Sequence, residues 1–365
     1  MSFTPRQIPR RLTAAVVAVG LAASATGAGC AHSDAPLDDA PSTTEAPTDA
    51  PTDAHEQNPR EQIAAKLMPG VVSYEDARAK LEAGVGGIFL TSWADPGLLT
   101  ESGRDINALR AEFDRPFEVA IDFEGGRVQR FDDILGSYPS ARDMAAGGPE
   151  GAQAQGAQIG ATLRDHGINV DFAPVLDVDG GDLEVVGDRS FSSDPQQAGE
   201  LGAAFARGLQ SSGVRPVFKH FPGHGRASGD THQGDAVTPP LDDMQGHDLV
   251  PYTRALPESQ SDDPATAPGV MVGHMVVPGL GDGETPSSLN PDAYGLLRDQ
   301  FGFGGTVYTD DLTGMQAITD RFAPADAATA GLAAGADAVL WSAEADINEV
   351  LDTAEQAARD GRIQV

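Results

Sequence analysis

The stretch from Lys219 to His232 reads KHFPGHGRASGDTH and crowds titratable side chains together. It holds one lysine, one aspartate and three histidines among glycines and a proline. Glycine and proline disfavour both helix and strand, so an irregular loop is expected here. Because a histidine titrates near neutral pH and can give and take a proton, this loop is the first candidate for chemistry.

Charged and imidazole groups also follow apolar runs elsewhere in the chain. Asp122 ends one such run, with Arg130 eight residues later; His274 lies in MVGHM, and Asp310 and Asp311 follow VYT. Each group adjoins residues expected to be buried, which argues against an ordinary solvated surface. If the runs are strands of a barrel, their carboxyl ends bring these groups to one rim.

Cleavage of a glycosidic bond is a chemistry that suits such a rim. Hydrolysis with retention of configuration needs a carboxylate nucleophile and a partner that protonates the leaving oxygen. Arginine, lysine, histidine and aspartate side chains around them can hydrogen-bond the sugar hydroxyls. An aspartate among lysine and histidine side chains stays ionised, and available as a nucleophile, because positive charges lower its pKa.

The elements that must position these residues alternate short β-branched runs with longer helix-like segments. Helices are expected at 195–213, 324–335 and 346–361. An α/β fold, a single-domain (β/α)8 (TIM) barrel, is therefore predicted. A doubly wound open sheet is the alternative, weakened because no Gly-rich phosphate loop opens a helix after the first strand. The expected strands are 63–70, 85–91, 117–123, 169–174, 215–220, 269–275, 304–311 and 336–341.

The composition limits the partners of the chain. Its 365 residues are 40% hydrophobic and carry a formal charge of −31, with a pI near 4.3. This acidity argues against binding nucleic acid through a basic face, and no nucleic-acid partner is expected.

Residues 1–30 are similar to an export signal. A basic start that includes Arg10 and Arg11 precedes the apolar stretch 12–26, which is too short for a convincing membrane span. The segment ends in GAGC, and Cys30 is the single cysteine of the chain. It resembles the lipobox of bacterial lipoproteins, in which this cysteine receives lipid and becomes the mature N-terminus. Ordinary signal cleavage with an incidental thiol is the alternative.

Residues 31–60 are rich in Pro, Ala, Thr and acidic residues, with almost nothing to bury. They are expected to form a disordered tether, followed by the barrel domain at 61–365. Behind a lipidated Cys30, the tether would hold that domain away from the membrane. The protein is expected to be anchored on the outer face of the cell membrane or to be secreted.

Seven motifs are similar to those of the β-N-acetylglucosaminidases (β-hexosaminidases) of glycoside hydrolase family 3. The family commonly reads KHFPGHG followed by Asp-Ser-His, and the resemblance covers nearly all of 61–361. Departures are small: Phe123 stands where glutamine is usual, and threonine replaces serine in two motifs. In the family's order, the motifs of this chain are DFEGGRVQRF, DFAPVLDV, GDRSF, KHFPGHG, DTH, TDDL and AGADAVL.

The resemblance implies a (β/α)8 barrel with a histidine acid/base on a mobile loop. That role falls on His232, with Asp230 as its dyad partner. The resemblance implies that Asp310 is the nucleophile. The side chains of Asp310 and Asp311 point to opposite faces of a strand, and this alternation does not by itself show which of the two faces the site. The substrate-binding positions that the resemblance implies are Asp122, Arg130, Arg189, Lys219 and His220.

Other readings compete with these roles. His220 and His224 are spaced like a helical metal pair, but Pro222 and Gly223 break the helix that such a pair requires. No metal is therefore expected, and His224 with His274 is expected to line or support the site instead.

Structural roles are the alternative for several site residues. Asp230 could instead cap the next turn, which is an ordinary role for aspartate. Arg130 and Arg189 could instead be structural ion-pair partners at the rim. Glu124, in the turn EGG, is expected to be structural rather than catalytic.

The function expected is that of a retaining exo-β-N-acetylglucosaminidase acting on peptidoglycan fragments or surface glycans through a covalent glycosyl-aspartate, without metal or organic cofactor. A phosphorylase is an alternative, because a histidine acid/base lacks the negative charge that repels phosphate. The others are a β-glucosidase of the same family and a lipoprotein that binds glycans without cleaving them. Intact Asp230, His232 and Asp310 argue against the last.

Overall fold

The computed structural model describes residues 58–180 and 183–364. The signal segment, Cys30 and most of the tether expected from the sequence lie outside the described residues. Helix α1 (Pro59–Ala64) begins just before the domain boundary expected at residue 61. Within the described ranges, none of the helices combines the length and the apolar character that a membrane span requires.

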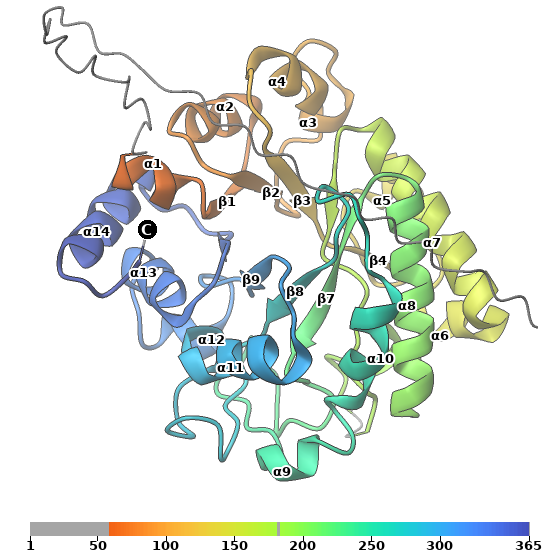
Figure 1. Cartoon of the computed structure of the whole chain (residues 1–365). Helices are drawn as coiled ribbons and strands as arrows, with labels where there is room; N and C mark the ends of the chain where they lie inside the picture. Colours follow the sequence, from red (N-terminus) through yellow and green to blue (C-terminus); the bar gives the residue numbers. More distant parts are fainter. Residues whose placement is uncertain (1–57, 181–182, 365) are drawn as a thin grey trace, which may run out of the picture. The chain divides into compact units, whose positions relative to one another are not determined.

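Eight parallel strands form one sheet in the order β10-β1-β2-β3-β6-β7-β8-β9 (Figure 1). A bridge between Tyr308 and Ala338 brings the two outermost strands together, so the sheet forms a barrel. Each strand overlaps one of the eight segments expected from the sequence; the barrel prediction is confirmed, and the open doubly wound sheet is wrong. The strands are β1 (Leu67–Val71), β2 (Gly87–Leu90), β3 (Glu118–Ile121), β6 (Val170–Asp171), β7 (Arg215–Phe221), β8 (Gly269–Val272), β9 (Val307–Thr309) and β10 (Val339–Trp341).

Helices cover the outside of the barrel (Figure 1). The three helices expected from the sequence are confirmed as α8 (Pro195–Ser211), α13 (Pro324–Ala334) and α14 (Ile347–Arg359). The other α-helices after α1 are α2 (Tyr74–Glu82), α3 (Gly97–Thr100), α4 (Ile106–Glu112), α5 (Asp132–Leu135), α6 (Ala141–Met144), α7 (Gly148–Asp165), α9 (Leu241–Met244), α10 (Val250–Glu258), α11 (Pro291–Gly295) and α12 (Gln316–Thr319). Shorter elements are the hairpin strands β4 (Phe123–Gly125) and β5 (Val128–Gln129), the 3-10 turns η1 (Ala145–Gly147), η2 (Gly187–Arg189) and η3 (Ser287–Leu289), and the π-helical turn η4 (Leu296–Gln300).

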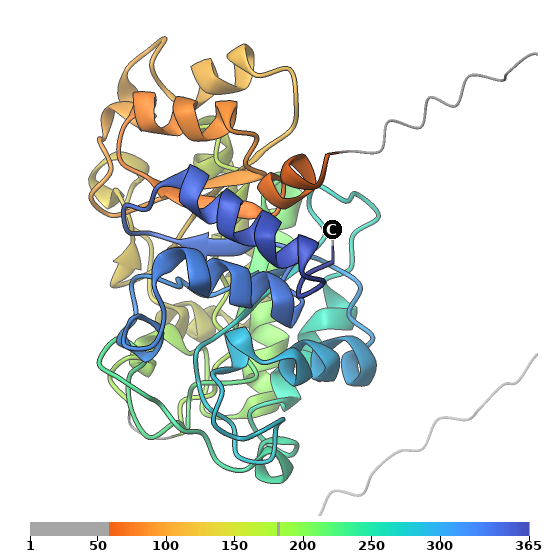
Figure 2. The same cartoon turned by 90° about the vertical axis from the view of Figure 1, so that its left-hand side faces the viewer.

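The two ends of the barrel domain lie side by side. Figure 2 shows α1, in dark orange, next to the blue helix α14. Arg60 of α1 forms ion pairs with Asp352 at 2.7 Å and Glu355 at 2.9 Å, both on α14. Strand β1 follows α1 directly and pairs with β10, which precedes α14, so the contact between the two helices supports the pairing of the first and last barrel strands of the chain.

Helices α7 and α8 pack together through glycines. A Cβ on Gly156 would lie 2.2 Å from the carbonyl oxygen of Phe205, and a Cβ on Gly208 would lie 2.2 Å from that of Gln153. Only glycine allows two helix backbones to approach this closely. Because α8 packs against β7, this contact helps to position the strand that carries Lys219.

The barrel interior has a packed core of its own. The ring of Phe172 lies 5.6 Å from those of both Phe89 and Tyr308, centroid to centroid. A larger apolar cluster fills the space between strands and helices. Successive residues of a strand face opposite sides, so each barrel strand except the two-residue β6 contributes to both cores. The interior is therefore filled, and reactive groups are available only where the strands end.

Candidate active site

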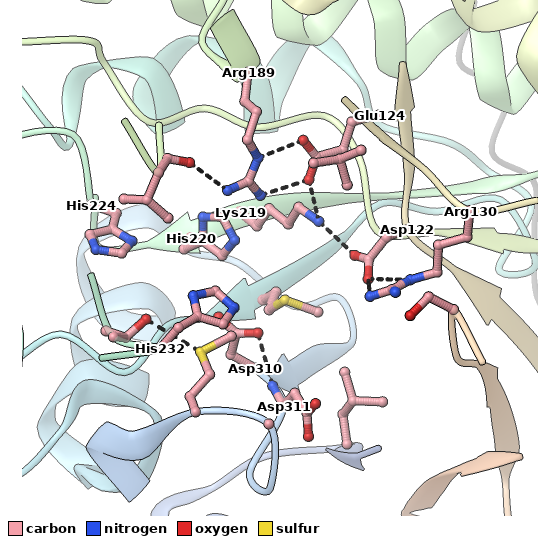
Figure 3. A pocket seen from close by; sticks show the side chains of 18 of the residues that line it. Asp122, Glu124, Arg130, Arg189, Lys219, His220, His224, His232, Asp310 and Asp311 are labelled. Carbon is pink, nitrogen blue, oxygen red and sulfur yellow. Dashed lines mark hydrogen bonds and ion pairs between the residues drawn. The ribbon is translucent and has the colours of Figure 1, made fainter. Parts of the chain in front are cut away.

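A pocket of about 390 Å³ lies at the carboxyl ends of the barrel strands, and we call it the inner pocket (Figure 3). Its lining comes from β2, β7, β8 and β10, the β4–β5 hairpin, the η2 region and the segments that follow β2, β3, β7 and β9. Asp230 and His274 do not line it. The residues singled out from the sequence that do are Asp122, Arg130, Arg189, Lys219, His220, His224, His232 and Asp310.

Alternating charges run along one wall of the inner pocket (Figure 3). Arg130 donates to Asp122 through Nε at 3.1 Å and Nη2 at 2.7 Å. Lys219 Nζ lies 2.8 Å from Oδ1 of Asp122 and 2.7 Å from Oε1 of Glu124. Arg189 donates to both oxygens of Glu124, from Nε to Oε2 at 2.8 Å and from Nη2 to Oε1 at 2.7 Å. Lys219 and Glu124 are buried, whereas Asp122 and Arg130 are partly exposed and accessible to a ligand.

This alternation keeps buried groups ionised. Burial raises the pKa of Asp122, but Lys219 and Arg130 outweigh it and hold the pKa below its ordinary value. Burial also raises the pKa of Glu124, but Arg189 and Lys219 outweigh burial and lower the pKa to about 2. Burial lowers the pKa of Lys219, yet the two carboxylates bring it above its ordinary value. The wall therefore carries fixed charges at neutral pH.

Asp310 and Asp311 follow β9 directly, and their carboxylates make different contacts. Both oxygens of Asp311 are engaged: Oδ1 accepts from the N–H of Thr313 at 3.0 Å and of Ser342 at 2.9 Å, and Oδ2 accepts from the Ser342 hydroxyl. Asp310 accepts one hydrogen bond from a described residue, from the N–H of Asp311 at 2.8 Å. Asp311 therefore ties two loops together, whereas Asp310 keeps acceptor capacity for a ligand.

The surroundings of Asp310 favour its ionised form. Burial raises its pKa, but the imidazoles of His220 and His274 and the N–H of Asp311 outweigh burial and lower it. His274 lies behind the pocket wall, where its Nδ1 is 2.7 Å from the Ser288 hydroxyl and its Nε2 is 2.9 Å from the Asp311 carbonyl. Its place is therefore that of a support for the Asp310–Asp311 segment.

His220 is oriented by a carboxylate that the sequence analysis did not single out. Oδ2 of Asp177 lies 2.6 Å from Nδ1 of His220, and Oδ1 accepts from the backbone N–H of His224 at 2.7 Å. Burial raises the pKa of Asp177, but His220 and His224 outweigh it and lower the pKa to about 2. Asp177 is the second aspartate of DFAPVLDV, so the motif itself was the signal that pointed to it.

Asp230 and His232 meet on the loop after β7. His232 Nδ1 lies 2.7 Å from Asp230 Oδ1, and the backbone N–H of His232 donates to the same oxygen at 2.9 Å. Burial raises the pKa of Asp230, and the hydrogen bonds from His232 outweigh it and lower the pKa. The His232 side chain is 52% exposed and lines the inner pocket. Since an ionised carboxylate accepts from Nδ1–H, Nε2 is the nitrogen left for a ligand.

The loop that carries this pair is attached at several points. The carbonyl oxygen of Gly229 lies 3.0 Å from Nε2 of His224, whose pKa burial lowers. Ala317 donates from its N–H to the carbonyl of Thr231 at 3.1 Å. His232 is thus held between β7 and the segment after β9. Over residues 58–180 and 183–364, no group of three or more His, Cys, Asp or Glu side chains is arranged to hold a metal ion.

The chain is similar to known proteins of one family. The N-terminal domain model of glycosyl hydrolase family 3 matches residues 60–365. The chain is 43% identical to the β-hexosaminidase LpqI of Mycobacterium tuberculosis over 315 residues, which cover 84% of this chain and 79% of LpqI.

Solved structures agree with this match. A family 3 glycosyl hydrolase from Mycobacterium smegmatis superposes with a TM-score of 0.79 and 45% identity, covering 85% of this chain and 93% of that one. A family 3 β-N-acetylglucosaminidase from Paenibacillus superposes with a TM-score of 0.76 and 30% identity, covering 84% of this chain and 59% of that one. The chain therefore belongs to glycosyl hydrolase family 3, among its β-hexosaminidases, as its motifs predicted.

Proposed function

We propose that this protein is a retaining exo-β-N-acetylglucosaminidase that removes terminal β-linked N-acetylglucosamine from peptidoglycan fragments or other surface glycans. The names of the β-hexosaminidase and β-N-acetylglucosaminidase relatives support the choice of sugar. The observation that carries the proposal is the position of Asp310, a buried carboxylate with free acceptor capacity in the pocket that His232 also lines. A retaining glycosidase needs a nucleophile and an acid/base in one pocket.

In the first step, Asp310 attacks the anomeric carbon and forms a glycosyl ester while the bond to the leaving oxygen breaks. His232, protonated and paired with Asp230, donates the Nε2 proton to that oxygen, so the leaving group departs as a neutral alcohol. The carboxylate of Asp230 stabilises the imidazolium before the transfer. Its 2.7 Å contact with Nδ1 supports this role.

In the second step, water hydrolyses the glycosyl ester. His232, now neutral, accepts a proton from the water at Nε2 while the water oxygen bonds to the anomeric carbon. Asp310 leaves as a carboxylate, and the configuration at the anomeric carbon is retained after two inversions. Both groups return to their starting protonation states.

The charged wall of the inner pocket is proposed to hold the sugar ring. Asp122 and Arg130 are its partly exposed members and are placed to hydrogen-bond hydroxyls. Lys219 and Arg189 act with them from deeper positions. His220 offers Nε2, because its Nδ1 is held by Asp177.

Export and lipid attachment at Cys30 are proposed from the sequence alone. The signal-like segment, the terminal GAGC and the acidic Pro- and Thr-rich stretch support a domain tethered to the outer face of the membrane. Labelling with a fatty-acid analogue, compared between the wild type and Cys30→Ala, tests the attachment.

Release of 4-nitrophenol from its β-N-acetylglucosaminide tests the activity, with and without phosphate. Turnover that is lost in Asp310→Asn and reduced in His232→Ala supports the glycosidase and both roles. A rate that depends on phosphate and yields a sugar 1-phosphate would identify a phosphorylase instead. Folded protein without turnover on this substrate or on the matching glucoside would favour a binding protein.

A further inference from the structure

A buried aspartate without a role in the proposed reaction lies behind the charged wall. Asp171 is the first aspartate of DFAPVLDV and the last residue of β6. Its side chain is fully buried and does not line the inner pocket. Asp177, the second aspartate of the same motif, orients His220. Asp171 must therefore be explained by its own contacts.

The side chain of Asp171 replaces a backbone acceptor at the point where the β4–β5 hairpin leaves the barrel. Strands β3 and β6 are paired as far as the bond from the N–H of Phe172 to the carbonyl of Ile121, at 2.8 Å. Phe123, the first residue of β4, then donates its N–H to Oδ1 of Asp171 at 3.0 Å. Because a buried N–H needs an acceptor, Asp171 fixes the start of the hairpin.

Phe123 stands between the two carboxylates of the charged wall. Along an extended backbone the side chains of Asp122 and Glu124 point to one side, and that of Phe123 points to the other. Both carboxylates contact Nζ of Lys219, at 2.8 Å and 2.7 Å (Figure 3). The position of the peptide at Phe123 therefore determines whether one ammonium group can hold both carboxylates.

We propose that Asp171 is a positioning residue for sugar binding, which holds the peptide N–H of Phe123 and thereby sets Asp122 and Glu124 about Lys219. This inference rests on the proposed glycosidase function, in which the charged wall holds the sugar ring. Asp122 is one of the wall's partly exposed members. A shift of the peptide at Phe123 thus changes the hydrogen bonds that the wall offers to a sugar.

The carboxyl group of Asp171 serves this role in its neutral form. Among the described residues, its buried Oδ2 has no hydrogen-bond partner. Burial raises the pKa of Asp171 well above its ordinary value, Asp122 and Glu124 add to the rise, and Lys219 and the N–H of Phe123 oppose it without cancelling it. A neutral carboxyl group still offers Oδ1 as an acceptor, and it leaves Lys219 to the two carboxylates of the wall.

Two substitutions at Asp171 separate the acceptor from the charge. Asp171→Asn keeps an uncharged oxygen acceptor on a side chain of the same length, whereas Asp171→Ala leaves the N–H of Phe123 without one. Asn169→Ala is the matched control. Oδ1 of Asn169 accepts from the N–H of Val119 at 2.7 Å, in the same strand pair but nearer its amino end. Asn169 does not line the inner pocket.

The test measures sugar binding apart from turnover, on the full-length protein. Calorimetric titration with N-acetylglucosamine gives Kd, and hydrolysis of 4-nitrophenyl β-N-acetylglucosaminide gives kcat and KM. We expect Asp171→Ala to raise Kd and KM at least about tenfold with kcat within about threefold, because the wall holds the sugar in the ground state and the transition state alike. Asp171→Asn and Asn169→Ala are expected to stay within about threefold of the wild type in all three constants.

A purely structural role for Asp171 predicts a different result. Both alanine variants would then lower the thermal midpoint and leave Kd alike, which would overturn the inference. A folded Asp171→Asn with Kd raised about tenfold would overturn it as well, because the charge would then matter; this arm decides even if Asp171→Ala does not fold. A wild type that neither binds the sugar nor cleaves the substrate would instead overturn the proposed function on which the inference rests.

Discussion

Asp177 accepts a 2.6 Å hydrogen bond from Nδ1 of His220 inside the barrel rim. Because the pKa of Asp177 is about 2, this carboxylate is ionised and can only accept, so Nδ1 of His220 carries the proton. The other ring nitrogen of His220, Nε2, is therefore the one that is available to a ligand in the inner pocket. A residue that does not line the pocket thus decides what the pocket offers a ligand.

Asp177→Asn is expected to lower kcat/KM about 10- to 100-fold, because an amide can donate to Nδ1 and select the other tautomer of His220. Nitrogen NMR of the His220 imidazole reports the tautomer directly. Asp179→Asn is the matched control, since Asp179 pairs with Arg142 at 2.8 Å, away from His220. An unchanged tautomer together with unchanged activity would contradict the assignment.

Asp310 and Asp311 are expected to respond differently to substitution. Asp310→Ala is expected to lose at least about a thousandfold in turnover with little loss of stability, since its carboxylate makes a single hydrogen bond to a described residue. Azide added to this variant takes the place of the nucleophile and yields the α-glycosyl azide. Asp311→Ala is expected to cost about 2–4 kcal/mol of unfolding free energy, because Ser342 and Thr313 lose their acceptor. A β-glycosyl azide from Asp310→Ala would reject its role.

Arg226 and Asp248 form an ion pair at the root of the loop that carries His232. Arg226 Nε and Nη2 lie 3.0 Å and 2.5 Å from Oδ2 of Asp248, whose side chain is 1% exposed. Arg226→Met leaves this buried carboxylate with only the 3.7 Å contact to Nδ1 of His247, so we expect a loss of about 2–4 kcal/mol in urea unfolding.

The exposed pair Arg78–Glu112, with side chains 43% and 34% exposed, provides the control. Arg78→Met is expected to change the unfolding free energy by less than about 1 kcal/mol. The double variant Arg226→Met/Asp248→Asn should recover part of the loss, because the buried charge is then gone. Equal losses of unfolding free energy at the two ion pairs would show that burial does not determine the cost of breaking them.

The close contact between α7 and α8 leaves no room for a side chain at Gly156. Gly156→Ala is expected to destabilise the fold by about 1–3 kcal/mol, because its Cβ would lie 2.2 Å from the Phe205 carbonyl oxygen. Gly151, in the same helix, has space for a Cβ, whose nearest atom would be 3.8 Å away. Gly151→Ala should therefore be neutral, or stabilising by up to about 1 kcal/mol. Thermal unfolding of both variants measures the difference, and similar midpoints would refute the close packing.

Acid is expected to unfold the barrel chiefly between about pH 4 and pH 2. Glu124 and Asp177 have pKa values of about 2 in the folded protein, below their unfolded values. A lowered pKa contributes stability that is present above the unfolded pKa and is lost as the pH falls through the folded one. Asp171, whose pKa burial raises, acts in the opposite direction, because its contribution to stability grows as the pH falls toward the unfolded pKa of an aspartate, near 4.

The thermal midpoint, followed from pH 6 to pH 2, measures this loss. Glu124→Gln removes one of the titrating groups, so its midpoint should fall less steeply with pH, although it starts lower. A wild-type midpoint that stays level between pH 4 and pH 2 would contradict the lowered pKa values.

The sequence by itself determined the barrel and the family. Strands are set by short runs of β-branched residues, a local property, and all eight were found where those runs occur. The sequence motifs likewise identified the family. Helix α7 was less visible, because its segment GPEGAQAQGAQIGATLRD is rich in glycine, a poor helix former. Close packing against α8 explains those glycines, and no local pattern reports such packing.

Only the tertiary structure decided how the carboxylates are used. Asp310 and Asp311 are neighbours of the same type, and they differ because Ser342, which follows the adjacent strand β10, engages Asp311 alone. Glu124 joins a buried ion-pair chain through Lys219, a residue far along the sequence. Hydrogen bonds and ion pairs depend on distances of a few ångströms between such remote residues, and those distances exist only after the strands have closed into a barrel.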